Sequence, residues 1–196
     1  MKLLIINLGS QYTHVIWRTM RDIGIEAVIK EPNVSASDAD FFDAYILSGG
    51  PSSASKMTPN AAHRILEAAK SGSKKPILGI CLGHQLMAHV LGGVVEKGSS
   101  AEYGISQISV DRAESIMEGM PHKFNAWVSH FDEVKKMPQD FIALAHSSTC
   151  KYEAMVHTSL PLFGVQFHPE VWHTEHGEKI LENFVKLAQE KNRKIA

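Results

Sequence analysis

Apolar positions along the chain fall into two patterns that alternate through its first half. Short unbroken apolar runs predict strands that are buried on both faces, whereas apolar residues spaced three and four apart predict helices with one buried face. The predicted strands span residues 3–8, 25–29, 44–47 and 77–80. The predicted helices span residues 11–23, 60–71 and 85–91. Because strand and helix alternate, the pattern predicts a largely parallel sheet with helices on its faces.

The second half of the chain has a different pattern, because strand-like runs follow one another with little helix between them. The predicted strands here span residues 105–110, 126–129, 141–146, 154–157 and 162–167. A closing helix is predicted over residues 178–188. Strands joined without a crossover helix favour antiparallel pairing near an edge of the sheet. We therefore predict a three-layer α/β fold, with a mostly parallel central sheet and a few antiparallel edge strands, in a single domain spanning residues 1–196.

Composition narrows the class of protein. The chain has 196 residues, a length that is typical of a single domain with one hydrophobic core. Its net charge of -1 gives no overall positive potential that would attract nucleic acid or an anionic membrane. No apolar run reaches the length of about 18 residues that a membrane-spanning helix requires. The start, MKLLIINLGSQ, turns polar too early for a signal peptide. The two cysteines, Cys81 and Cys150, form no disulfide framework, so we expect a reducing, cytoplasmic location.

The stretch GICLG places Cys81 between two glycines, where an apolar strand changes to an apolar helix. Small residues on both sides of a nucleophile are typical of a sharp strand-to-helix turn that exposes the nucleophile above the sheet. A helix amino end favours a thiolate, and the backbone N–H of Leu82 is a candidate donor to a developing oxyanion. A buried structural cysteine is the alternative. Cys150 lacks this setting and is expected to be a small core residue.

The stretch GVQFHPE contains the most suitable base for such a nucleophile. His168 follows the last buried strand, so it is expected at the same sheet edge as Cys81, where parallel sheets place their sites. Pro169 favours an extended backbone at His168. Residues two apart in an extended chain project to the same side, so Glu170 can orient the imidazole. A surface histidine before a turn is the alternative.

The stretch SGGP, at residues 48–51, follows the third predicted strand. Two glycines allow a backbone N–H to turn towards a ligand, so the N–H of Gly50 is a candidate second oxyanion donor; a plain turn is the alternative. The stretch also resembles the phosphate loop of ATP pyrophosphatases, but Ser52 stands where that loop has aspartate. The chain has no G-x-x-x-x-G-K-[ST] motif either, so we predict no nucleotide binding by this chain.

Two histidines, His173 and His176, raise the question of a metal site. Their spacing matches neither the H-E-x-x-H nor the H-x-x-E-H pattern of metalloproteases. No third ligand is evident beside them, although a zinc site needs at least three protein ligands. We therefore expect no metal site in this chain.

Together these motifs resemble those of the class I (triad-type) glutamine amidotransferases, whose fold is flavodoxin-like. GICLGHQ matches the family pattern G-x-C-x-G-x-Q, GVQFHPE matches its histidine–glutamate motif, and SGGP matches its oxyanion strand, in the family's order along the chain. The resemblance implies glutamine hydrolysis with Cys81 as nucleophile, His168 as base and Glu170 as its orienter. It also implies that Gly50 and Leu82 supply the oxyanion N–H groups.

The resemblance further implies a set of glutamine-binding residues. Gln85 resembles the residue that recognises the substrate glutamine. The stretch Ser129-His-Phe-Asp132 resembles the loop whose backbone holds the amino-acid end of the substrate, which adds Ser129, Phe131 and Asp132. Phe131 stands where many family members have glycine, and Glu133 stands where many have lysine.

Two further stretches resemble the glutaminases of GMP synthetases. The opening NLGSQYTHVIWR resembles their N-G-S-Q-Y start, and HPEVWHT followed by Gly177 resembles their H-P-E-V-x-H-T-x-x-G. In that group an ATP pyrophosphatase, fused or separate, uses the ammonia to aminate XMP. The chain stops at Ala196, so we expect a separate glutaminase subunit of the archaeal type. We expect no cofactor in this chain, and ATP and magnesium on the partner subunit.

Residues that flank the substrate loop and the triad are expected to face this partner. They are Asp132, Glu133, His173 and Thr174. Other functions remain as alternatives: a glutaminase subunit for anthranilate, aminodeoxychorismate or carbamoyl phosphate synthesis, a γ-glutamyl hydrolase, or a catalytically silent regulatory module on the same fold.

Overall fold

A mixed β-sheet lies at the centre of the molecule in the computed structural model, which describes residues 1–193; the last three residues of the predicted domain lie outside it. The order of the described strands is β2-β1-β3-β4-β9-β8-β7-β5-β6. Five neighbouring strands are parallel: β2 (Glu26–Lys30), β1 (Lys2–Ile6), β3 (Ala44–Leu47), β4 (Ile77–Ile80) and β9 (Leu162–Val165). The predicted α/β fold, with its parallel strands and its antiparallel edge, is confirmed.

The antiparallel part of the sheet is larger than the sequence pattern indicates. It consists of β8 (Ala154–His157), β7 (Phe141–His146), β5 (Val94–Val110) and β6 (Lys123–Lys136). β5 and β6 form a long ribbon whose register shifts between Lys97 and Glu102. The predicted strands at 105–110 and 126–129 covered only part of this ribbon, because its other residues are mostly polar and exposed on one face.

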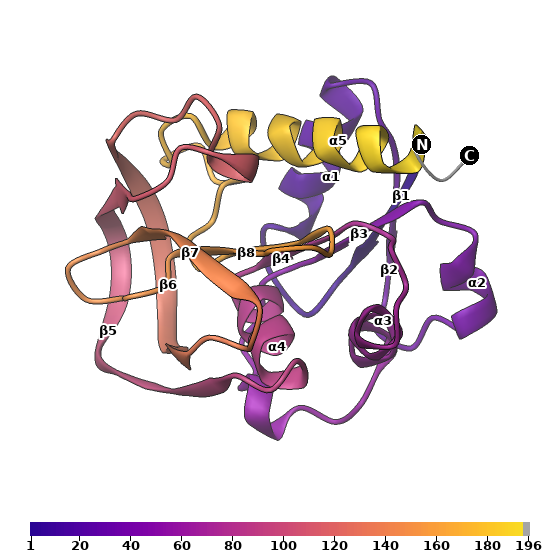
Figure 1. Cartoon of the computed structure of the whole chain (residues 1–196), viewed down its shortest axis with the longest axis horizontal. Coiled ribbons are helices and arrows are strands. Elements are labelled where there is room, and N and C mark those ends of the chain that lie inside the picture. Colours follow the sequence, from indigo (N-terminus) through magenta and orange to yellow (C-terminus); the bar gives the residue numbers. More distant parts are fainter. Residues whose placement is uncertain (194–196) are drawn as a thin grey trace.

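Helices cover both faces of the sheet. On one face lie α1 (Thr13–Asp22) and α5 (Gly177–Arg193), and on the other lie α3 (Ala61–Lys70) and α4 (Leu82–Val90) (Figure 1). A short helix, α2 (Ala36–Asp40), was not predicted, because its sequence ASDAD has no apolar spacing; the Ser35 side chain caps it. Among the described helices, none combines the length and the apolar character needed to span a membrane.

The register of the parallel strands decides where the functional motifs meet. Leu47 of β3 pairs with Gly79 of β4, and Gly79 pairs with Gly164 of β9. The stretches that follow these three adjacent strands therefore leave the same edge of the sheet. They carry the SGGP turn, Cys81 and His168, so a site at the carboxyl ends of the strands is built from three separate parts of the sequence.

Candidate active site

Cys81 occupies the sharp turn between β4 and α4. Its backbone has φ 50° and ψ -102°, a conformation that residues with a side chain rarely adopt. The flanking glycines are required by contact: a Cβ on Gly79 would lie 2.5 Å from the carbonyl of Gly83, and a Cβ on Gly83 would lie 2.2 Å from the carbonyl oxygen of Leu47. The structure thus contains the strand-to-helix elbow that GICLG predicts. Helix α4 begins directly after it, at Leu82 instead of the predicted residue 85.

His168 and Glu170 form a buried pair beside this elbow. Their Nδ1 and Oε1 atoms are 2.9 Å apart, and their side chains are 5% and 0% exposed. Burial by itself would lower the pKa of His168, but the Glu170 carboxylate and the contact with Cys81 outweigh burial and raise this pKa to about 10. A Cβ placed on Gly49 would lie 3.0 Å from His168 Cε1 and 3.6 Å from Cys81 Cβ, so both side chains meet over Gly49.

The backbone of His168 is also held from both sides. Its N–H donates to the carbonyl oxygen of Trp127 at 2.9 Å, and its own carbonyl accepts from Thr174 Oγ1 at 2.6 Å. Thr174 Oγ1 in turn accepts from the Trp127 N–H at 3.0 Å. The ring of Tyr12 packs edge-on against the imidazole, with 5.3 Å between ring centroids. Both GMP-synthetase-like stretches, at the start and after His168, therefore contribute contacts that fix this histidine.

The two predicted oxyanion donors both adjoin the nucleophile. Among the described residues, the backbone N–H groups of Gly50 and Leu82 have no hydrogen-bond acceptor, so both are available to a ligand. A Cβ on Gly50 would lie 2.1 Å from the carbonyl oxygen of Leu8, so only glycine fits there. The oxyanion role of these groups stays a prediction, and their free N–H groups are what it requires.

The cleft at Cys81 has two lobes that share Cys81, Gly50 and Ser129. One lobe, of about 300 Å³, is lined by residues from the opening stretch, including Ser10 and Tyr12. The other lobe, of about 310 Å³, is lined by all four residues expected to bind glutamine: Gln85, Ser129, Phe131 and Asp132. The structure thus brings the predicted substrate residues together on one side of the nucleophile.

The stretch 129–132, which the resemblance identifies with a loop, lies within strand β6 and pairs with β5. It is held in the second lobe by its backbone and by one aspartate. Gln85 Nε2 donates to the Asp132 carbonyl oxygen at 2.6 Å, and Ser53 Oγ donates to the Asp132 carboxylate at 2.7 Å. Phe131 is 45% exposed, and its ring lies 5.2 Å from the Lys97 ammonium. The replacement of the common glycine by Phe131 therefore adds an exposed side chain, while the backbone contact with Gln85 is made by the neighbouring Asp132.

Two residues expected at a partner interface are buried. Glu133 is 6% exposed and pairs with Lys135. The alternation that buries Phe124, Ala126 and Val128 of β6 is broken further along the strand, where Glu133 and Val134 are both buried. Thr174 is also 6% exposed and bonds the backbone of His168. Neither side chain is open to a partner, contrary to our expectation. Asp132 is partly buried and His173 is exposed, so their contact with a partner stays a prediction.

A buried polar cluster in the antiparallel part was missed by sequence reasoning. Glu102, His130 and Glu153 come from β5, β6 and the segment before β8, and their ligand atoms lie within 4.8 Å of one another. Glu102 and His130 pair at 3.0 Å, whereas the Glu153 carboxylate has no hydrogen-bond partner among the described residues. Burial and the neighbouring Glu102 raise the pKa of Glu153 to about 8. Of the described residues these three are the ones whose grouping could hold a metal ion; His173 and His176 are not among them.

Comparison with known proteins decides the family. The sequence pattern of the class-I glutamine amidotransferases matches residues 4–188. The chain belongs to this family. It is 48% identical over 190 residues to a Pyrococcus abyssi protein named as a subunit of glutamine-hydrolyzing GMP synthase, covering 96% of this chain and 99% of that protein. It is 42% identical to the protein of the same name from Methanocaldococcus jannaschii, covering 94% of this chain and 96% of that protein.

Solved structures agree with this assignment. A Thermoplasma acidophilum protein described as a subunit of GMP synthase has a TM-score of 0.91 and 33% identity, covering 100% of this chain and 96% of that one. A glutamine amidotransferase from Thermotoga maritima has a TM-score of 0.75 at 20% identity, covering 98% of this chain and 84% of that one. The second likeness concerns the fold alone. The resemblance to class I amidotransferases that the motifs indicate is confirmed.

Proposed function

We propose that this chain is the glutamine-hydrolysing subunit of a GMP synthase. The observation that carries the proposal is the arrangement of Cys81, on a glycine-flanked elbow, beside the buried pair of His168 and Glu170 at the floor of a two-lobed cleft. The relatives named as GMP synthase subunits match nearly the full length of this chain and supply the choice of product.

The geometry supports a thioester mechanism. With its raised pKa, His168 is an imidazolium at neutral pH and lies next to the Cys81 sulfur. The thiolate attacks the side-chain amide carbon of glutamine, and the carbonyl electrons move to an oxyanion held by the N–H groups of Gly50 and Leu82. When the oxyanion collapses, the C–N bond breaks and the nitrogen takes the His168 proton to leave as ammonia. Neutral His168 then removes a proton from water, which attacks the thioester and releases glutamate and the Cys81 thiolate.

The second product, ammonia, requires an acceptor. We propose that a separate ATP pyrophosphatase subunit holds ATP and magnesium, adenylylates XMP and aminates it to GMP, while this chain carries no cofactor. Docking near the cleft mouth would let ammonia pass directly to the partner, and the exposed His173 and the partly buried Asp132 are the candidate contacts. A cytoplasmic location, which keeps the Cys81 thiol reduced, is part of the proposal.

The proposal is tested by reconstitution with the cognate XMP-aminating subunit. Glutamine, ATP, magnesium and XMP should give GMP with both subunits present, and Cys81→Ala should stop this synthesis while added ammonia still supports it. Replacing XMP by chorismate or bicarbonate should give no aminated or carbamoylated product. Glutamine hydrolysis without any GMP would reject the GMP synthase assignment and favour one of the other glutaminases.

A further inference from the structure

Gln166 contacts the nucleophile in a way that the mechanism above does not use. It follows the end of β9, two residues before His168, where the chain bends, and its side chain is fully buried, at 0% exposure. Its Nε2 atom donates to Cys81 Sγ at 3.7 Å. Because this sulfur forms the covalent bond to the substrate, a hydrogen-bond donor at this distance acts directly on a reacting atom.

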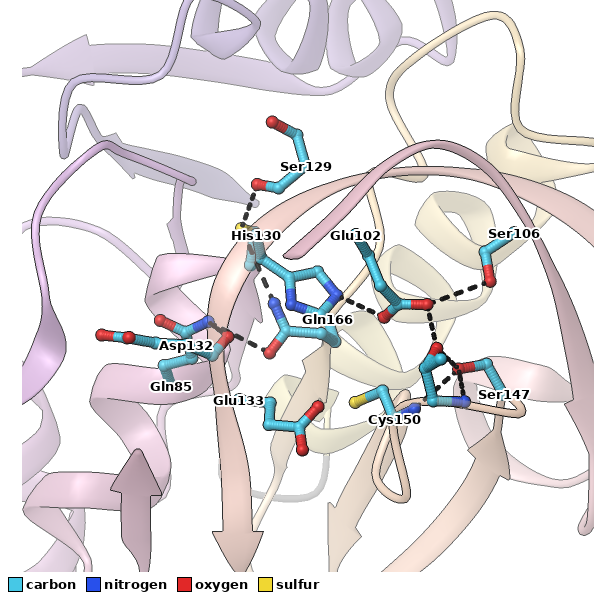
Figure 2. A network of polar contacts seen from close by, with 12 residues as sticks. Gln85, Glu102, Ser106, Ser129, His130, Asp132, Glu133, Ser147, Cys150 and Gln166 are labelled. Atoms are coloured by element: carbon cyan, nitrogen blue, oxygen red, sulfur yellow. Dashed lines mark hydrogen bonds and ion pairs between the residues drawn. The ribbon is translucent and has the colours of Figure 1, made fainter. Parts of the chain in front are cut away.

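Two hydrogen bonds fix which end of the Gln166 amide is the oxygen and which is the nitrogen. Gln85 Nε2 donates to the carbonyl oxygen of Asp132 at 2.6 Å, and a carbonyl oxygen can only accept. The NH₂ group of Gln85 therefore lies on this side, and its second contact, at 3.2 Å, must be with the oxygen Oε1 of Gln166. The Gln166 oxygen Oε1 is therefore directed to Gln85 (Figure 2). The NH₂ group of Gln166 then faces the Cys81 sulfur.

A donor next to the sulfur matters most when the sulfur is charged. Cys81 is 5% exposed, so little water can solvate a thiolate there. The carbonyl oxygen of Ser129, 3.9 Å from the sulfur, is an acceptor and cannot stabilise an anion. His168 and Gln166 are the donors that face the sulfur, and a hydrogen bond to a charged acceptor is about twice as strong as one between neutral groups.

We propose that Gln166 is a positioning residue that orients the Cys81 sulfur and stabilises its anionic form, and that Gln85 keeps the Gln166 amide in its donating orientation. This inference rests on the proposed function for the role of Cys81 as nucleophile. It also links β6 to the nucleophile, since Gln85 bridges the Asp132 carbonyl and the Gln166 amide.

Alkylation of Cys81 by iodoacetamide, followed by mass spectrometry at a series of pH values, tests the proposal, because the thiolate is the reactive form. Gln166→Met keeps the length of the side chain and removes the donor. Gln166→Glu keeps an acceptor for Gln85 and places a second acceptor against the sulfur. Gln166→Met should slow alkylation at neutral pH about ten- to hundredfold, the range for a lost hydrogen bond to a charged group, and Gln166→Glu should slow it further. In both variants the pH midpoint of alkylation should rise.

A matched control is Gln107→Met, which changes an exposed glutamine on β5 and should react as the wild type does. Unchanged rates and midpoint in Gln166→Met would overturn the proposal. Slowing in Gln166→Glu alone would overturn it too, because repulsion would then be the whole effect. The readout needs neither glutamine nor a partner, so a wild type that fails to hydrolyse glutamine but shows these effects would reject the proposed function and leave this inference standing.

A second measurement uses the wild type itself and covers the case in which both variants fail to fold. The side-chain amide resonance of Gln166, observed by NMR, should shift with pH at the midpoint of Cys81 alkylation. In Cys81→Ser this shift should be lost, because no thiolate forms. A wild-type resonance that does not respond at that midpoint would overturn the proposal.

Discussion

The parallel and antiparallel parts of the sheet differ in where they place their polar groups. The strands β1, β3, β4 and β9 are apolar and almost fully buried, and polar chemistry begins only where they end, at the SGGP turn, Cys81 and His168. In the antiparallel part, ionisable groups lie within the fold itself, as the buried cluster of Glu102, His130 and Glu153 shows. The first part gives a rigid frame to a strained nucleophile, and the second carries the β6 residues that are expected to bind glutamine, at a cost in buried polar groups.

The two cysteines provide the largest expected contrast between these parts. Cys81→Ala should reduce glutamine hydrolysis to background, because it removes the nucleophile. Cys150→Ala should leave hydrolysis nearly unchanged, since Cys150 is 0% exposed and burial raises the pKa of its thiol. A glutamine-mimicking electrophile should label Cys81, as detected by mass spectrometry. A label on Cys150 would contradict the assignment of the nucleophile.

The two buried Glu–His pairs sharpen the comparison. Glu170→Gln should lower turnover by about 100-fold or more, because His168 loses the charge that stabilises its imidazolium. Glu102→Gln removes the equivalent charge from His130. His130 lines the second lobe, but among the described residues its ring nitrogens make no hydrogen bond to the triad, so turnover should change only a few-fold. Steady-state kinetics of both variants with glutamine check this. Equal losses would mean that the antiparallel pair also takes part in catalysis.

The pair of His168 and Glu170 predicts a pH dependence of the free energy of unfolding. The pKa of His168 is raised from 6.5 to about 10 in the folded protein, so its contribution to stability is complete below about pH 6.5 and is lost as pH rises to about 10. Denaturant unfolding of the wild type should therefore show a falling free energy of unfolding across this range. In Glu170→Gln the fall should be smaller, and an identical slope would show that Glu170 does not set the pKa of His168.

Glycines at the Cys81 elbow and in the antiparallel part should differ in their tolerance of alanine. Gly83→Ala should cost about 3 kcal/mol or more, because the new Cβ would lie 2.2 Å from the carbonyl oxygen of Leu47. Gly104 of β5 has φ 115° but open space around it, so Gly104→Ala should cost about 1–2 kcal/mol of backbone strain. Chemical denaturation measures both values. Similar costs would show that the elbow can relax.

Glu153→Gln should have an effect of the opposite sign, because it should stabilise the protein. The folded-state pKa of Glu153 is raised from 4.5 to about 8, so its protonated form contributes stability below about pH 4.5 that is lost as pH rises through about 8. Glutamine cannot ionise, so the variant should be more stable than the wild type near pH 8, by about 1–3 kcal/mol. Glu96→Gln, at an exposed position on β5, is the control and should show no such gain.

The frame of the site could be predicted because its strands are continuous apolar runs. The predicted bounds 44–47, 77–80, 141–146 and 154–157 agree with the strands of the structure. The motifs GICLG and HPE place Cys81, His168 and Glu170 correctly at one sheet edge, because their position depends only on following parallel strands. Helix α3 lies within its predicted range, with Asn60 as the capping residue at its start.

Other features depend on contacts between distant residues and could not be predicted. The position of Glu133 on the buried face of β6 follows from the register with β5, which shifts at an irregularity between Lys97 and Glu102. The contact of Gln166 with Cys81 joins residues 85 positions apart. Gln166 stands two residues before His168, but the chain bends there after the end of β9, and nothing in the sequence indicates its amide partner.

The backbone of Cys81 also implies a compromise between folding and activity. With φ 50°, this residue would be best accommodated as glycine, which carries no Cβ penalty in that region. Cys81→Gly should therefore be about 1 kcal/mol more stable than Cys81→Ala, the reverse of the usual order beside a helix. Selection for stability alone would favour glycine at this position. The cysteine is retained because this strained backbone conformation orients its sulfur for function.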